Sequence, residues 1–246
     1  MTAPVLFIGG VDSSAGAGIL RDCETARAAG ASMRIAVTAL TAQTDHNVSA
    51  IHPVPVNNVT AQIKAAGHVS AVKIGMLATT HIAQAISQSL PQAPLVLDPV
   101  LAASSGHPLL DKDGIDILLT SLLPQSTLLT PNLPELYELA RRLGIFKSAD
   151  ERACVALLMQ RGCPAVLVKG GHASASTDCE DRLYLRDRQV IRFSGPRFTG
   201  NLRGTGCQLA SAIAIELARG ASVPGAVMTA RNTVQERFHL CDHPAA

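Results

Sequence analysis

Gly204-Thr205-Gly206-Cys207, running on into the helix-forming segment 208–219, is the stretch around which the rest of the chain is organised. The two glycines leave room for a ligand to approach the backbone. Gly220 follows where a glycine commonly ends a helix. A glycine turn at a helix N-terminus presents unpaired N–H groups and the positive end of the helix dipole, so the stretch predicts an anion site.

Cys207 lies within this field, which predicts a lowered thiol pKa and a thiolate. The alternative interpretation is a tight turn that contains a small buried cysteine. The four residues alone do not separate the two, so the rest of the chain has to decide.

The composition indicates a large α/β chain with a sizeable core. The 246 residues are 47% hydrophobic and have a mean hydropathy of +0.23, which argues against disorder. The net charge is +2 with scattered Lys and Arg, and only 3% of residues are aromatic. We therefore expect no nucleic-acid partner, because both a basic face and stacking platforms are lacking.

Targeting signals are not apparent in the sequence. Residues 1–10 have a short apolar centre without a basic segment before it, and no run approaches the roughly 20 apolar residues that span a bilayer. We expect a cytoplasmic protein with no membrane partner.

The six cysteines form no CxxC pair and are interpreted as reduced thiols. His239, Cys241 and His243 cluster near the C-terminus. A metal site there is conceivable, but a frayed polar tail is favoured.

Short apolar runs alternate with longer helical patterns along the chain. The runs expected to be strands are residues 5–8, 34–40, 69–75, 94–98, 127–130 and 165–169, with an antiparallel hairpin formed by 183–185 and 189–193. The segments expected to be helices are residues 19–30, 57–66, a stretch from 79 or 80, 113–122, 135–143, 148–162, 208–219 and 223–238.

Several helix starts carry capping signals. Asn57 and Thr79 or Thr80 are expected N-caps, Pro134 suits a first turn, and residues 148–151 read as a capping box.

Repeated strand–helix units predict an α/β fold, a three-layer αβα domain with a mainly parallel central sheet and a small antiparallel edge hairpin. No linker or repeat interrupts residues 1–246, so one domain is expected, with the last few residues as a tail.

Polar and glycine residues recur after successive strands, where open parallel sheets bind their ligands. Any one of these residues is weak evidence for a binding site, because each also has an ordinary structural role available to it. Together they favour a binding cleft. The set comprises the loop 9–18, Gln43, residues 73–76, Asp98, Asn132 with Glu135, residues 169–171, and residues 204–207.

This set suits phosphoryl transfer, which relies on Mg²⁺, a cation and backbone N–H groups. Asp98 and Glu135 are oxygen ligands for Mg²⁺, and Lys169 can neutralise nucleotide phosphate. The turn 204–206 can cradle the transferring group, and Cys207 can take the proton of an acceptor hydroxyl. The Walker A and G-x-G-x-x-G patterns do not occur, so neither a P-loop kinase nor a standard dinucleotide fold is indicated.

The chain resembles hydroxymethylpyrimidine and hydroxymethylpyrimidine phosphate kinases, of the ribokinase-like fold and thiamine biosynthesis. The resemblance covers nearly the whole chain in the family's order. Its motifs are residues 9–18 with Asp22, then 38–43, 73–77, 97–100, 105–110, 130–135, 168–172 and 204–207.

The resemblance implies ATP-dependent phosphorylation of the hydroxymethyl group of 4-amino-5-hydroxymethyl-2-methylpyrimidine and, in many members, of its monophosphate. It implies Mg²⁺, leaves a monovalent cation open, and suggests a homodimer. The substrate-binding positions it implies are Gly10, Asp22, Gln43, Met76 and Val100. Those for ATP are Asn132, Glu135 and Lys169, and those for the metal are Asp98 and Glu135. The catalytic positions are Gly204, Thr205, Gly206 and Cys207, and Cys207 stands where sugar-kinase relatives carry an aspartate base.

The chain departs from the family's pattern around the acceptor and the phosphate. Ala15 with Gly16 replaces a glycine pair, residues 44–48 differ after Gln43, Ser104 replaces a lysine, and Leu202 with Arg203 replaces a Thr-His pair. Arg203 adds positive charge beside the anion site, or is merely surface-exposed. The acceptor and the second phosphorylation therefore stay open.

Two alternatives remain at this stage. A pyridoxal-type kinase would use the same site for a hydroxymethyl group on a flat heteroaromatic ring. A non-catalytic sensor would bind a pyrimidine in a decayed kinase site.

Overall fold

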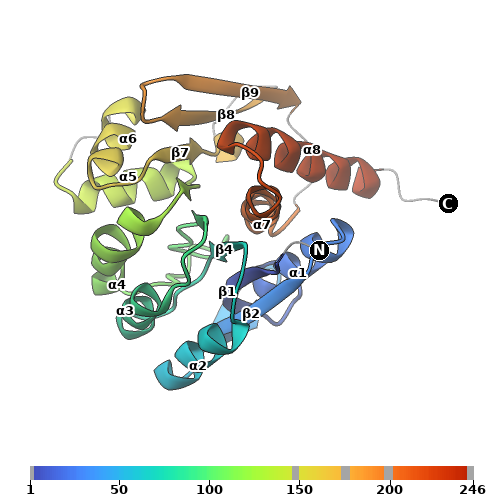
Figure 1. Cartoon of the computed structure of the whole chain (residues 1–246), viewed down its shortest axis with the longest axis vertical. Coiled ribbons are helices and arrows are strands. Elements are labelled where there is room, and N and C mark those ends of the chain that lie inside the picture. The colour runs from blue at the N-terminus through green and yellow to red at the C-terminus, as the bar shows by residue number, and fades with distance from the viewer. Residues whose placement is uncertain (1–2, 146–149, 173–177, 197–201, 243–246) are drawn as a thin grey trace.

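Six short aliphatic runs form the parallel part of one sheet (Figure 1). The computed structural model describes residues 3–145, 150–172, 178–196 and 202–242. The strand order is β3-β2-β1-β4-β5-β6-β7-β8-β9. In this order, the neighbours from β2 through β1, β4, β5 and β6 to β7 pair in parallel. The parallel strands are β1 (Val5–Asp12), β2 (Met33–Gln43), β4 (Ala71–Ile74), β5 (Leu95–Leu97), β6 (Leu128–Leu129) and β7 (Ala165–Val168).

Antiparallel strands close both edges of the sheet. The predicted hairpin is confirmed as β8 (Asp178–Leu185) and β9 (Val190–Pro196), longer than expected and paired to β7. The other edge strand, β3 (Val48–Pro53), pairs with β2 and was not predicted. It has little apolar alternation and ends on a proline, which an edge strand tolerates.

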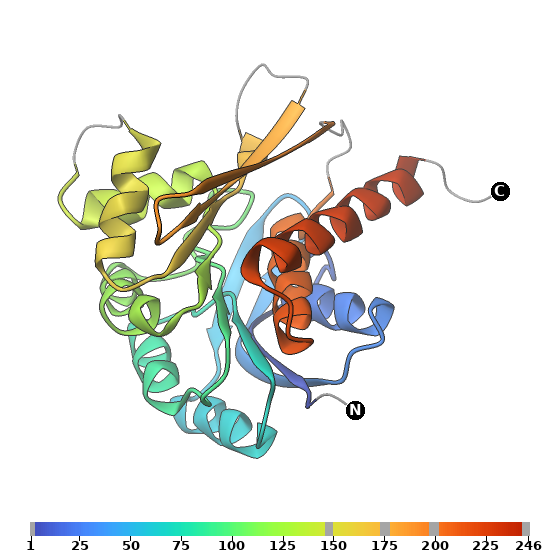
Figure 2. The same cartoon turned by 45° about the horizontal axis from the view of Figure 1, so that its top comes forward.

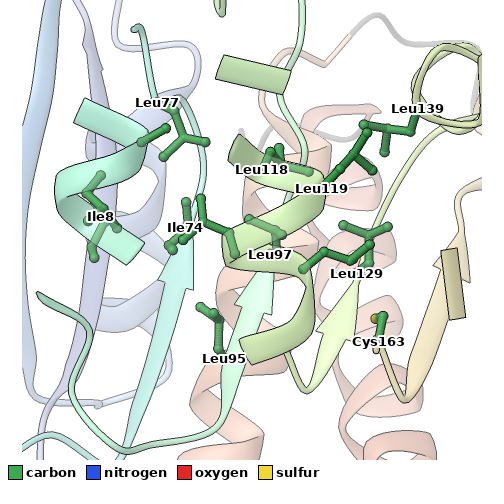
Figure 3. Close-up of a cluster of buried hydrophobic side chains, with 14 of the residues drawn as sticks. Ile8, Ile74, Leu77, Leu95, Leu97, Leu118, Leu119, Leu129, Leu139 and Cys163 are labelled. Atoms are coloured by element: carbon green, nitrogen blue, oxygen red, sulfur yellow. The ribbon is translucent and has the colours of Figure 1, made fainter. Parts of the chain in front are cut away.

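Helices cover both faces of the sheet, so the predicted three-layer fold is confirmed (Figure 2). The strand residues alternate between two hydrophobic clusters: Leu6 and Ile8 belong to one, Val5 and Phe7 to the other. On the first face, partly drawn in Figure 3, lie α2 (Val56–Ala66), α3 (Thr80–Ser89), α4 (Lys112–Ile117), α5 (Leu133–Arg142) and α6 (Glu151–Gln160). On the second lie α1 (Gly18–Ala28), α7 (Thr205–Ala218) and α8 (Val223–Asp242).

The helix caps agree with the sequence in part. Thr79 caps α3 by accepting a hydrogen bond from Ile82 N at 3.3 Å. Asn57 is not a cap, because α2 already starts at Val56 after Pro55. Asp150 caps α6, whereas the predicted box began at Ser148, which lies outside the described residues.

Two helix ends also differ from expectation. The segment predicted as one helix over 113–122 is α4, followed by a wider π turn, Leu118–Leu122, and a 3-10 turn, Leu123–Gln125, at Pro124. A frayed tail was expected from His239, but α8 continues to Asp242, so this prediction is wrong for residues 239–242. Residues 243–246 lie outside the described range. No helix within the described residues is long and apolar enough to cross a membrane.

Candidate active site

A cavity of about 900 Å³ opens beyond the carboxyl ends of the parallel strands. Gln43 and Cys207, from the two ends of the chain, both line it. The residues that the sequence assigned to a site all border this one cavity: Gly10, Asp22, Gln43, Met76, Asp98, Val100, Asn132, Glu135, Lys169, Gly204, Thr205, Gly206 and Cys207. Their individual roles stay predictions.

The turn before α7 has the geometry of an anion cradle. Gly204 is the N-cap with φ +74°, and a Cβ there would lie 2.3 Å from Gly16 O, so only glycine fits without a shift. The first bond within the helix runs from Gln208 N to Gly204 O at 2.9 Å, which leaves the N–H groups of residues 205–207 outside the helical ladder. A Cβ on Gly206 would lie 3.3 Å from Lys169 Nζ, so an ammonium stands beside these donors.

Lys169 also joins the two carboxylates proposed as metal ligands. Its Nζ lies 2.8 Å from Asp98 Oδ1 and 3.8 Å from Glu135 Oε2. Thr130 Oγ1 donates to the same Asp98 oxygen at 3.1 Å. This places one positive and two negative side chains together beyond the carboxyl ends of β5, β6 and β7.

Glu135 is fixed by a capping box at the start of α5. Its Oε2 accepts from Asn132 N and its own N–H donates to Asn132 Oδ1, both at 2.8 Å. Burial raises the pKa of Glu135 to about 7, with Lys169 opposing the shift and Asp98 adding to it.

The donor set fits a magnesium ion held partly through water. The hydrogen bonds described above use Asp98 Oδ1 and Glu135 Oε2, which leaves the second oxygen of each carboxylate for the ion or its waters. Within the described residues no group of three His, Cys, Asp or Glu could cage a metal. Magnesium commonly takes one or two carboxylates and completes its shell with water and phosphate oxygens.

The pKa of the Cys207 thiol is raised, so the predicted depression is wrong. Burial is the largest cause, because removing water penalises the thiolate. Lys73 and the Gly18 N–H favour the thiolate, whereas Asp22 and Asp98 oppose it. The helix N-terminus does not outweigh the loss of solvent.

Asp22 forms a buried ion pair at the wall of the cavity. Both its oxygens accept from Lys73 Nζ at 2.9 Å, and Ser211 Oγ donates to Oδ1 at 2.6 Å. Lys73 is 1% and Asp22 0% exposed. The sequence quoted Lys73 without giving it a role, although a lysine inside an otherwise aliphatic strand is itself a sign of a buried partner.

Near Gln43 the cavity is lined by Asp12 and Arg203, to which the sequence gave no binding role. Gln43 Nε2 lies 3.5 Å from Asp12 Oδ2, and Arg203 donates to that same oxygen at 2.9 Å. The Arg203 side chain is only 13% exposed, so the interpretation of Arg203 as a surface charge is wrong.

The opposite end also contains residues without a local sequence signal. Arg231 Nε donates to Asp181 Oδ2 at 2.8 Å, and Gly170 N donates to Asp181 Oδ1 at 2.7 Å. Both side chains line the cavity. They join β8 and α8 to the loop after β7.

The model of the phosphomethylpyrimidine kinase family matches residues 12–243. A hydroxymethylpyrimidine/phosphomethylpyrimidine kinase from Haemophilus influenzae is 36% identical over 94% of this chain and 88% of its own. A chloroplastic thiamine biosynthetic bifunctional enzyme from Arabidopsis thaliana is 37% identical over 94% of this chain, which spans only 45% of that protein.

Solved structures show the same fold. A phosphomethylpyrimidine kinase from Clostridium difficile superposes with a TM-score of 0.78 at 31% identity, covering 96% of this chain and 99% of its own. The pyridoxal kinase of Staphylococcus aureus in complex with ADP gives 0.85 at 27% identity, covering 96% and 87%.

Proposed function

Because this chain belongs to the phosphomethylpyrimidine kinase family, we propose that it phosphorylates the hydroxymethyl group of 4-amino-5-hydroxymethyl-2-methylpyrimidine with ATP. The protein is a phosphotransferase of thiamine biosynthesis with a ribokinase-like fold. We extend the proposal to the monophosphate of the same pyrimidine, because the relatives' names cover both steps.

The observation that carries the proposal is one cavity shared by an amide and an anion cradle. Gln43 lines one end, and the amide can donate to a ring nitrogen and accept from an exocyclic amine. Met76 and Val100 supply apolar surface for a flat ring beside it. Lys169 and the turn before α7 supply the positive charge that a transferring phosphoryl group needs.

In the proposed reaction the acceptor oxygen attacks the γ-phosphorus of ATP, and the bond to the β–γ bridging oxygen breaks to release ADP. Lys169 and the N–H groups of residues 205–207 stabilise the charge on the transferring group. We assign Cys207 to receive the hydroxyl proton. Burial raises the pKa of its thiol and opposes the thiolate that this step needs, whereas Lys73 favours the thiolate. Asn132 positions Glu135, and Asp98 and Glu135 would hold Mg²⁺, which would neutralise phosphate charge.

A pyridoxal-type kinase is the second candidate, because pyridoxal kinases are among the structural neighbours. A non-catalytic sensor is the third, and the presence of Asp98, Glu135, Lys169 and Cys207 in one cavity argues against it. A monovalent cation, a homodimer and a cytoplasmic location remain predictions.

A steady-state comparison of the pyrimidine and pyridoxal with Mg-ATP tests the proposal, with mass spectrometry of the products to separate mono- from diphosphate. We expect a higher kcat/KM for the pyrimidine. A tenfold preference for pyridoxal, about 1.4 kcal/mol, would reverse the assignment. Tight heterocycle binding without any ADP formation would indicate the sensor.

A further inference from the structure

Four side chains form a cluster at the acceptor end of the cavity, here called the acceptor clamp: Asp12, Ser14, Asp45 and Arg203. The Arg203 guanidinium donates to Asp12 Oδ2 at 2.9 Å, to Ser14 Oγ at 2.5 Å and to Asp45 Oδ1 at 2.9 Å. Asp12 ends β1, Ser14 follows it, Asp45 lies in the turn between β2 and β3, and Arg203 directly precedes the N-cap of α7. The clamp therefore joins three segments that are distant in the sequence.

The position of Arg203 is specified from several sides. A Cβ on Gly16 would lie 2.8 Å from its Nη1, so the guanidinium packs directly against that glycine. The main-chain carbonyl oxygen of Arg203 accepts from Arg237 Nη2 at 3.1 Å. Of its two carboxylate partners, Asp12 is 6% and Asp45 69% exposed, so the pair with Asp12 is the less screened one.

Asp12 transmits this position to Gln43. Its Oδ2 receives both Arg203 and Gln43 Nε2, and its Oδ1 receives the N–H and hydroxyl of Ser14. Ser13 adds a main-chain link, because its hydroxyl donates to Gln43 O at 3.0 Å and accepts from Gln43 N at 2.9 Å. Gln43 Oε1 in turn accepts from Thr41 Oγ1 at 3.5 Å, so both ends of the Gln43 amide have protein partners.

The clamp also connects the places where this chain departs from the family pattern. Arg203 and Asp45 each fall in one of the altered motifs, and in the structure they form an ion pair. Arg203 also packs against Gly16, the glycine that follows the altered position Ala15. Two departures that are distant in the sequence thus contact each other in the structure.

We propose that Arg203 is a positioning residue for the acceptor: by holding Asp12 against the amide of Gln43, it sets acceptor affinity without taking part in phosphoryl transfer. This inference rests on the proposed function, since it assumes that the acceptor binds at Gln43. It assigns Arg203 to the heterocycle and not to ATP.

The test measures kcat and both KM values for Arg203→Ala and Arg203→Lys, with whichever hydroxymethyl heterocycle the wild type phosphorylates. We expect Arg203→Ala to raise the acceptor KM by about tenfold or more, with the KM for ATP and kcat changed by less than about threefold. Lysine carries one ammonium and cannot reproduce the fork that spans Asp12 and Asp45, so Arg203→Lys should restore only part of the affinity.

Arg142→Ala is the matched control, because Arg142 pairs with Asp116 at 2.6 Å and does not line the cavity. It should leave all three kinetic constants unchanged. A fall in kcat with unchanged acceptor KM for Arg203→Ala, an equal rise in both KM values, or no change at all would each overturn the proposal.

A double-mutant cycle with Gln43→Ala separates positioning from general loosening. If Arg203 acts through Gln43, Arg203→Ala should add little to the acceptor KM once Gln43 is removed. Independent, additive effects would contradict the proposal even if Arg203→Ala alone behaves as expected.

The two proposals fail in distinguishable ways. If the wild type phosphorylates neither heterocycle, the proposed function is wrong, and calorimetric binding of the pyrimidine to the wild type and Arg203→Ala still tests the clamp. If the wild type is active but the variants do not separate acceptor from ATP, only the clamp is wrong.

Discussion

Cys207 is subject to opposing electrostatic influences. Burial, Asp22 and Asp98 favour its neutral thiol, while Lys73 and the Gly18 N–H favour the thiolate. The sequence identified the residue and its helix N-terminus, but it could not show that the surrounding protein removes water from the partly buried sulfur. Desolvation is a tertiary property, and it reversed the predicted direction of the pKa shift.

We predict that Cys207→Ala lowers kcat by about 10²-fold or more while acceptor binding changes little, because general-base catalysis is commonly worth 10²–10⁴-fold. Steady-state kinetics and calorimetric acceptor binding measure the two effects. Cys163→Ala serves as the control, since Cys163 is buried but does not line the cavity. Near-wild-type turnover of Cys207→Ala would limit the thiol to shaping the anion cradle.

The raised pKa of Glu135 predicts that the free energy of unfolding of the protein depends on pH. Its folded pKa of about 7 lies above the ordinary value of 4.5, so the folded state binds the proton more tightly than the unfolded state. The associated stability is present below pH 4.5 and is lost as the pH rises through 7. Glu135→Gln cannot ionise and can keep the capping box, so it should become the more stable protein at pH 8, by at most about 3 kcal/mol.

Thermal melts of the ligand-free proteins between pH 5 and 8 check this prediction. Glu138→Gln on the same helix is the control: the pKa of Glu138 is lowered by its hydrogen bond to Arg141, so its contribution to stability does not change above pH 5 and the difference from wild type should stay constant over this range. A constant difference between wild type and Glu135→Gln across this range would contradict the prediction.

At the scale of elements, the parts with local physical causes were predictable. The parallel strands follow from aliphatic runs, and the start of α5 follows from Asn132 and Pro134. Gly220, with φ +89°, ends α7 as expected. The strand β3 was not predicted because half of its residues are exposed, only one is buried, and no apolar alternation marks it. The end of α4 escaped because Leu118–Leu122 keeps a helical sequence pattern while its backbone widens.

The turn before α7 makes a prediction that a matched glycine can isolate. Gly204→Ala places a methyl group 2.3 Å from Gly16 O, in addition to the cost of about 1–2 kcal/mol for a left-handed alanine. Gly220→Ala has the same backbone cost but no heavy atom within 4 Å of the new carbon.

We therefore expect Gly220→Ala to lose about 1 kcal/mol and Gly204→Ala at least about 2 kcal/mol more, in urea unfolding experiments. Gly204→Ala should also impair turnover, because the cradle moves with the turn. Equal losses in the two variants would mean that the turn relaxes freely.

At the scale of the whole molecule, a buried network ties the two ends of the chain together. Asp22 on α1 contacts Lys73 on β4 and Ser211 on α7, and Ser211 lies 189 residues further along the chain. Apart from Lys73, a lysine in an otherwise aliphatic strand, no local pattern marks these contacts. The same holds for Arg203 with Asp45, 158 residues apart, and for Arg231 with Asp181, which is why the sequence found the cavity's lining but not these partners.

Lys73→Met should cost about 3–5 kcal/mol of unfolding free energy, because it leaves the Asp22 carboxylate buried without its cation. Replacing both, as Lys73→Met with Asp22→Leu, should recover much of that loss, since no uncompensated charge remains. Chemical denaturation measures both. The more exposed ion pair Arg142–Asp116 serves for comparison, and its removal should lower the free energy of unfolding by less than about 1 kcal/mol. A double variant as unstable as Lys73→Met alone would contradict the charge argument.

The two ends of the cavity come from different parts of the chain: Gln43 ends β2 and Met76 follows β4, whereas Asn132 and Lys169 follow β6 and β7. Gene duplication followed by drift in the N-terminal strands could therefore yield daughters that accept new ring alcohols while inheriting an unaltered way of handling the nucleotide. Arg203 is an exception to this partition, and lineages that exchange their ring specificity are expected to change it together with its distant partners.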